Sequence, residues 1–95
     1  MVIISYDVNT EDSQGRKRLR RVAKSCEKIG QRVQNSVFEC LVEPDRLVAI
    51  KGVLLKEIDK QKDSLRIYYL GSNWERRVEH FGVGEGYNPE GTIML

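Results

Sequence analysis

The leading candidate for chemistry in this chain is Asp7, which ends an apolar N-terminal run, V-I-I-S-Y-D-V. Alternation along a strand places Val2, Ile4 and Tyr6 on the core side, so Asp7 lies on the opposite face at the end of its strand. A carboxylate there can bind a divalent cation such as Mg²⁺ next to a phosphodiester. One carboxylate is a weak site, whereas two that meet across a dimer interface would suffice. The alternative is that Asp7 starts the following turn, where aspartate is common.

A strongly basic segment follows this strand. Residues 16–32 hold eight lysines and arginines and one glutamate, so they carry +7 in a chain whose total is only +2. Such a concentration of charge favours a surface for nucleic acid, and the alternative is an ordinary solvated helix face. Contacts of this kind position phosphates rather than read bases. The residues predicted to bind nucleic acid are Arg16, Arg18, Arg20, Arg21, Lys24 and Arg32.

Three other residues are predicted to lie near this site. Tyr6 and Phe38 occupy core-facing positions, so packing is their expected role, and a place at an edge near nucleic acid is the alternative. Ser36 falls at a turn, where serine is common, and a hydroxyl near the metal or phosphate is its alternative role. His80 is the only histidine, and we expect a surface strand residue there rather than a general base.

The elements that position these side chains follow from hydrophobic spacing. The first strand covers about residues 1–8. A helix follows it, with Asp12 or Ser13 as the N-cap and Gly30 in a left-handed conformation at its end. The apolar stripe of this helix has helical spacing. It consists of Leu19, Val22, Ala23, Cys26 and Ile29.

The rest of the chain predicts a β-hairpin, a second helix and further strands. Residues 31–34 and 37–43 form the hairpin, and Pro44 opens the helix. A strand follows in D-S-L-R-I-Y-Y-L-G, and residues 77–81 form a short fifth strand. The order β-α-β-β-α-β indicates an α+β, ferredoxin-like fold, an antiparallel sheet with both helices on one face.

Length and composition indicate one globular domain. We predict that residues 1–82 form it and that 83–95 are a flexible loop and an edge strand of the same domain. The apolar end of the chain, residues 92–95, would pair with the sheet edge of a second subunit. No stretch approaches the roughly 20 apolar residues of a membrane span. The N-terminal residues lack the basic flank and the small-residue cleavage site of a secretory signal, so we expect none. Cys26 and Cys40 are expected to be reduced thiols of a cytoplasmic protein.

The strand ending in Y-D-V, the basic helix K-R-L-R-R-V-A-K and the segment G-Q-R-V-Q-N-S-V-F-E together resemble the small CRISPR-associated endonuclease family, from residue 1 to at least residue 71. The resemblance implies a homodimer in which two copies of Asp7 meet and bind Mg²⁺, with Mn²⁺ as the other candidate ion. It also implies hydrolysis of RNA or double-stranded DNA in antiviral defense. Finally, it implies that the dimer bridges CRISPR integrase dimers on DNA during spacer acquisition.

Two functions remain open from the sequence. The first is a Mg²⁺-dependent endonuclease that uses paired Asp7 residues. The second is a non-catalytic homodimeric scaffold that holds DNA in the spacer-acquisition complex. A domain of the RNA-recognition type is disfavoured, because the central strands lack the aromatic motif that such domains use to stack bases.

Overall fold

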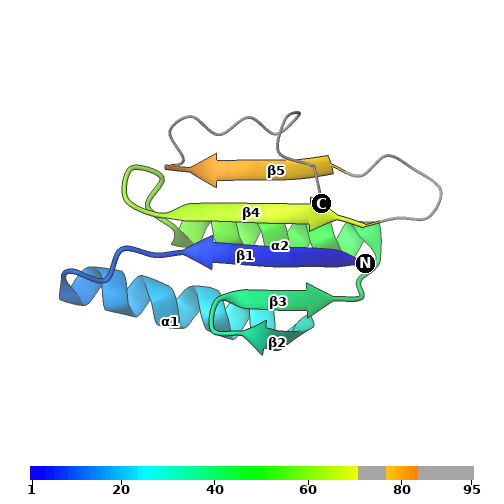
Figure 1. Cartoon of the computed structure of the whole chain (residues 1–95), viewed down its shortest axis with the longest axis horizontal. Helices are drawn as coiled ribbons and strands as arrows, with labels where there is room; N and C mark the ends of the chain where they lie inside the picture. The colour runs from blue at the N-terminus through cyan, green and yellow to red at the C-terminus, as the bar shows by residue number, and fades with distance from the viewer. Residues whose placement is uncertain (71–76, 84–95) are drawn as a thin grey trace.

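The computed structural model describes residues 1–70 and 77–83 (Figure 1). Within these residues the predicted order of elements is confirmed, the fifth strand included. A loop and an edge strand were predicted for residues 83–95, of which residues 84–95 lie outside the described residues. The elements are β1 (Val2–Asp7), α1 (Ser13–Glu27), β2 (Gly30–Gln34), β3 (Val37–Cys40), α2 (Pro44–Glu57), β4 (Ser64–Tyr69) and β5 (Arg77–Gly82).

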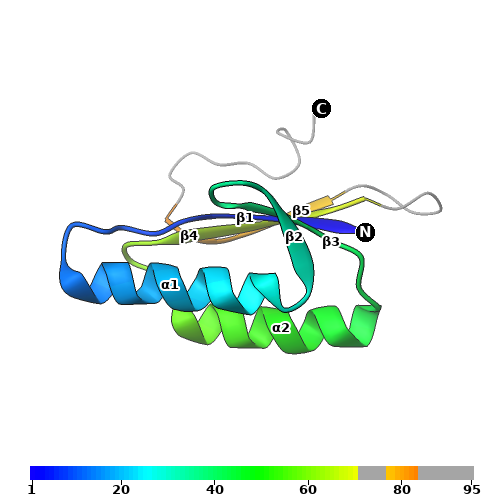
Figure 2. The ribbon, with the colours of Figure 1, turned by 90° about the horizontal axis from the view of Figure 1, so that it is seen from below.

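The strands form one antiparallel sheet with the order β2-β3-β1-β4-β5. Figure 2 shows that α1 and α2 lie side by side on the same face of this sheet. The α+β, ferredoxin-like arrangement expected from the sequence is therefore confirmed. Among the described residues, neither helix has the length and apolar character needed to cross a membrane.

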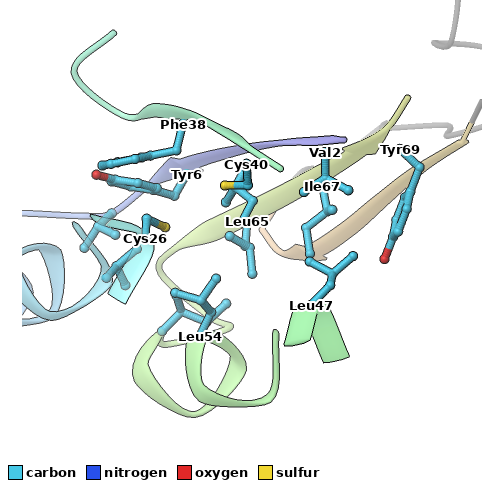
Figure 3. Close-up of a cluster of buried hydrophobic side chains, with 14 residues drawn as sticks. Val2, Tyr6, Cys26, Phe38, Cys40, Leu47, Leu54, Leu65, Ile67 and Tyr69 are labelled. Atoms are coloured by element: carbon cyan, nitrogen blue, oxygen red, sulfur yellow. The ribbon is translucent and has the colours of Figure 1, made fainter. Parts of the chain in front are cut away.

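The hydrophobic core lies between the sheet and the two helices (Figure 3). Every second residue of the central strands faces it, because strand side chains alternate. Ile4 of β1, Phe38 of β3 and Leu65 of β4 are fully buried there. Leu54 and Val22 close the core from the helices. The opposite face of the sheet is the one to which Asp7 belongs.

Helix boundaries follow local signals, with one exception. The Asp12 carboxylate accepts a hydrogen bond of 2.8 Å from the Gly15 backbone N–H and so caps α1, and Pro44 begins α2. The prediction of a left-handed Gly30 was wrong, because α1 ends at Glu27 and Gly30 starts β2. Glycine is needed at position 30 for close packing, since a Cβ atom there would overlap the Cys40 side chain.

Candidate functional site at the end of β1

The Asp7 side chain is exposed at the end of β1. It pairs with Ser64 of β4 in the sheet register, and two residues earlier Ser5 pairs with Arg66. These four side chains share the helix-free face of the sheet, because residues opposite each other on antiparallel strands point the same way. A hollow of about 310 Å³ opens here. It is lined by Ser5, Tyr6, Asp7, Ser36, Ser64 and Arg66.

The donors around this hollow suit a hard cation and a phosphate. Carboxylate and hydroxyl oxygens are ligands for Mg²⁺, which also retains several waters. The Arg66 guanidinium is a fork that matches phosphate oxygens. Within residues 1–70 and 77–83, no three His, Cys, Asp or Glu side chains gather to hold a metal ion. Asp7 fits Mg²⁺ as one carboxylate ligand, and among the residues described no second carboxylate lines the hollow.

Tyr6 and Phe38 are packing residues of the core, as the sequence indicated (Figure 3). Their rings stack with centroids 6.1 Å apart. The Arg32 guanidinium lies over the Phe38 ring, 5.2 Å from its centroid. Burial raises the pKa of Tyr6, with the Cys26 charge as a smaller cause, so its phenol stays protonated near neutral pH. The hydroxyl is buried without a hydrogen-bond partner among the described residues. Tyr6 is therefore a core residue and is not suited to act as a base.

A buried carboxylate, Asp63, holds the end of β1 in place. Asp63 is fully buried and accepts hydrogen bonds from the backbone N–H groups of Asn9 at 3.0 Å and Asp59 at 2.8 Å. Its oxygens also accept from the Arg18 side chain, at 2.8 Å from Nε and 3.3 Å from Nη2. Because Asn9 lies two residues after Asp7, this cluster fixes the chain that follows the candidate ligand.

The position of Arg18 differs from that of the other cations predicted to bind nucleic acid. Only 14% of its side chain is exposed, and its guanidinium is engaged by Asp63. Burial opposes the ionised form of Asp63, yet the Arg18 and backbone hydrogen bonds outweigh it and lower the pKa of this carboxyl. We therefore assign Arg18 a structural role and leave it out of the proposed binding surface.

A separate region, here called the α1 basic surface, is formed by the exposed cations of α1, which are Arg16, Lys17, Arg20, Arg21 and Lys24. A shallow depression of about 650 Å³ lies among them. Figure 2 shows α1 on one face of the sheet, and strand alternation assigns Asp7 to the other face. None of these cations lines the hollow. Arg32 lies on β2 and is half-exposed beside Glu27, at 3.5 Å.

Three residues of the hollow were missing from the sequence-based site: Ser5, Ser64 and Arg66. The signal was present, since Ser64 and Arg66 alternate with the core residues Leu65 and Ile67. This alternation identifies Ser64 and Arg66 as site residues only when β4 is known to pair with β1. The expectation for His80 is corrected in part, because this residue is half-buried on β5 and its Nδ1 accepts a hydrogen bond of 3.2 Å from Arg66 Nε.

The fold and site define a small ferredoxin-like protein with an acidic residue at the end of its first strand and a basic first helix. The chain belongs to the family described as CRISPR associated protein Cas2, whose model matches residues 1–78. It is 56% identical over its whole length to the CRISPR-associated endoribonuclease Cas2 of Nitratidesulfovibrio vulgaris, covering 93% of that protein. It is also 56% identical to the CRISPR-associated endonuclease Cas2 of Halalkalibacterium halodurans, covering 99% of it.

A solved structure agrees with this membership. The crystal structure of Streptococcus pyogenes Cas2 superposes with a TM-score of 0.69 at 60% sequence identity. The match covers 77% of this chain and 88% of that one.

Proposed function

We propose that this protein is a homodimeric, metal-dependent endonuclease of a CRISPR system that hydrolyses phosphodiester bonds in RNA or double-stranded DNA. The observation that carries the proposal is the exposed Asp7 carboxylate in a hollow lined by hydroxyls and one arginine. The names of the relatives, endoribonuclease and endonuclease, support the same reaction. The two free, buried thiols Cys26 and Cys40 are compatible with a reducing compartment, and we place the protein in the cytoplasm.

Hydrolysis here forms a bond from a water oxygen to phosphorus and breaks the bond from phosphorus to the leaving sugar oxygen. The water loses a proton and the leaving oxygen gains one. Asp7 would hold Mg²⁺, or Mn²⁺ in its place, and the bound ion would supply charge stabilisation for the reacting phosphate. Ser5 and Ser64 line the hollow with Asp7 and place two hydroxyl groups next to this carboxylate.

The second carboxylate comes from a second copy of the chain in this proposal. Ile3, Val37 and Tyr68 give the helix-free face an apolar part, and each is only half-buried within one chain. Packing two such faces together buries these side chains and brings two copies of Asp7 toward one axis. The same dimer would bridge integrase dimers on DNA, with the α1 basic surface directed at phosphates.

The central test compares Asp7→Asn with wild type in a cleavage assay on RNA and duplex DNA. Loss of metal-dependent charge stabilisation of about 3 kcal/mol lowers the rate by about 100-fold or more. Asp45→Asn is the matched control, because Asp45 is an exposed aspartate at the start of α2, on the helix side of the sheet, and lies outside the hollow. EDTA should abolish cleavage by wild type. Full activity of Asp7→Asn would contradict the proposal.

Mixed dimers test whether two carboxylates share one ion. Wild type and Asp7→Asn are unfolded together, refolded at defined ratios, and assayed. If one site needs both copies of Asp7, activity follows the square of the wild-type fraction, so an equal mixture retains about a quarter of the activity. A linear dependence would mean that each subunit acts alone.

The non-catalytic scaffold is the second candidate, and the α1 basic surface favours it because it lies apart from Asp7. A purified wild type that cleaves neither substrate with Mg²⁺ or Mn²⁺ would rule out the enzyme. Spacer insertion that persists in Asp7→Asn would then show that the DNA-holding role is independent of the carboxylate.

A further inference from the structure

Arg66 of β4 lies diagonally opposite Asp7 of the neighbouring strand β1. Asp7 pairs with Ser64 and Ser5 pairs with Arg66, so Arg66 is two residues along β4 from the position opposite Asp7. Diagonal neighbours of this kind are roughly 7–8 Å apart at Cα, within reach of a long side chain. Arg66 also lines the same hollow as Asp7.

The orientation of Arg66 is set by the next strand. Arg66 pairs with His80 of β5, and Arg66 Nε donates a hydrogen bond of 3.2 Å to His80 Nδ1. Both side chains are half-buried, which restricts their rotamers. The guanidinium is thereby fixed at its Nε edge before any ligand binds.

Two other arginines, Arg18 and Arg32, lie outside the hollow. Arg18 contacts Asp63, and Arg32 lies over the Phe38 ring. The α1 basic surface lies in the opposite layer. Among the described residues that line the hollow, Arg66 is the one with a cationic side chain.

We propose that Arg66 is a catalytic residue that binds the non-bridging oxygens of the scissile phosphodiester next to Asp7, and that His80 is its positioning residue. A guanidinium binds two phosphate oxygens at once and keeps its charge at all working pH values. It therefore stabilises the charge that develops on the phosphate in the transition state. This inference rests on the proposed nuclease function.

The first test is the cleavage rate of Arg66→Gln at saturating substrate. Loss of one preorganised donor to a developing charge lowers kcat by about 100-fold, whereas substrate affinity changes by less than about threefold. Arg66→Lys keeps a point charge without the fork and is expected to be intermediate. Arg46→Gln, which removes an exposed arginine on α2 outside the hollow, is the control and should match wild type. Unchanged kcat in Arg66→Gln would overturn the inference.

His80 is tested by a pair of variants. His80→Asn retains an acceptor near the Nδ1 position, and His80→Leu removes it. We expect His80→Leu to lower kcat by about tenfold without a change in KM and His80→Asn to restore most of the rate. Equal rates in the two variants would mean that His80 does not position Arg66.

A binding measurement separates this inference from the proposed function. The Arg66 Nε–H resonance of ¹⁵N-labelled protein is followed by NMR during titration with inorganic phosphate and with a thymidine dinucleotide, without metal. A saturating shift, also present in Asp7→Asn, is expected. If wild type fails to cleave but the shift occurs, the nuclease proposal is wrong and Arg66 remains a phosphate ligand. If cleavage depends on Asp7 but the shift is missing, the Arg66 inference alone is wrong.

Discussion

Replacement of Asp63 by asparagine is expected to destabilise the fold strongly although the two side chains have the same shape. Asp63 Oδ1 accepts from Asn9 N and Arg18 Nη2, and Oδ2 accepts from Asp59 N and Arg18 Nε. An asparagine keeps one oxygen and presents an NH₂ group to the other two donors. Two hydrogen bonds to a buried carboxylate are lost, at about 1.5 kcal/mol each, so we expect a loss of about 3 kcal/mol.

Urea unfolding at pH 7 measures this change, and thermal unfolding should show a decrease in Tm of about 15 °C. Asp45→Asn is the matched control, because Asp45 is an exposed aspartate at the start of α2. Its loss should cost less than about 1 kcal/mol.

The effect of Asp63→Asn should also depend on pH. Since the pKa of Asp63 is lowered in the folded protein, its stabilisation is complete above the ordinary value of 3.8 and is lost as pH falls through the folded pKa. The difference between wild type and Asp63→Asn should therefore shrink when unfolding is measured below about pH 3.8 rather than at pH 7. A destabilisation under about 1 kcal/mol at pH 7, or one of equal size at both pH values, would refute the account of this cluster.

Three further predictions follow from packing and charge. Gly52→Ala should stabilise the protein by about 0.5–1 kcal/mol in urea unfolding, because an added Cβ on α2 meets nothing within 4 Å. Gly30→Ala should destabilise it by about 1–3 kcal/mol, because an added Cβ there would overlap Cys40. Burial raises the pKa of the Cys26 thiol to about 12, so Ellman's reagent at pH 8 should modify it only when the protein unfolds. Reversal of Arg20 and Arg21 to glutamate should weaken nucleic-acid binding and reduce the slope of log K against log salt by about 2, as measured by fluorescence anisotropy.

Local sequence patterns were sufficient to predict most of the fold. Alternation in β1 and the helical stripe of α1 are properties of short segments, and the structure confirms them. Gly30 was misassigned because a glycine after a helix usually ends it, whereas here the constraint is contact with Cys40, ten residues away. Such a contact is invisible until β2 and β3 are paired.

The site was predictable only in part for the same reason. Asp7 stood out because a charge at the end of an apolar strand is unusual. Asp63 did not stand out, because the segment D-K-Q-K-D-S has the composition of a turn. The partner of Asp63, Arg18, is 45 residues away in the chain. Arg66 carried a usable signal in the alternation of β4, but its role depends on the register with β1 and β5.

The edge strand β2 has a consequence for how copies of this protein meet. It has five residues, four of them exposed, and its pairing with β3 is interrupted between Arg32 and Gln34. A short, polar and irregular edge is a poor template for strand addition by another chain. Assembly through β2 is therefore disfavoured, which protects the protein from open-ended aggregation along this side.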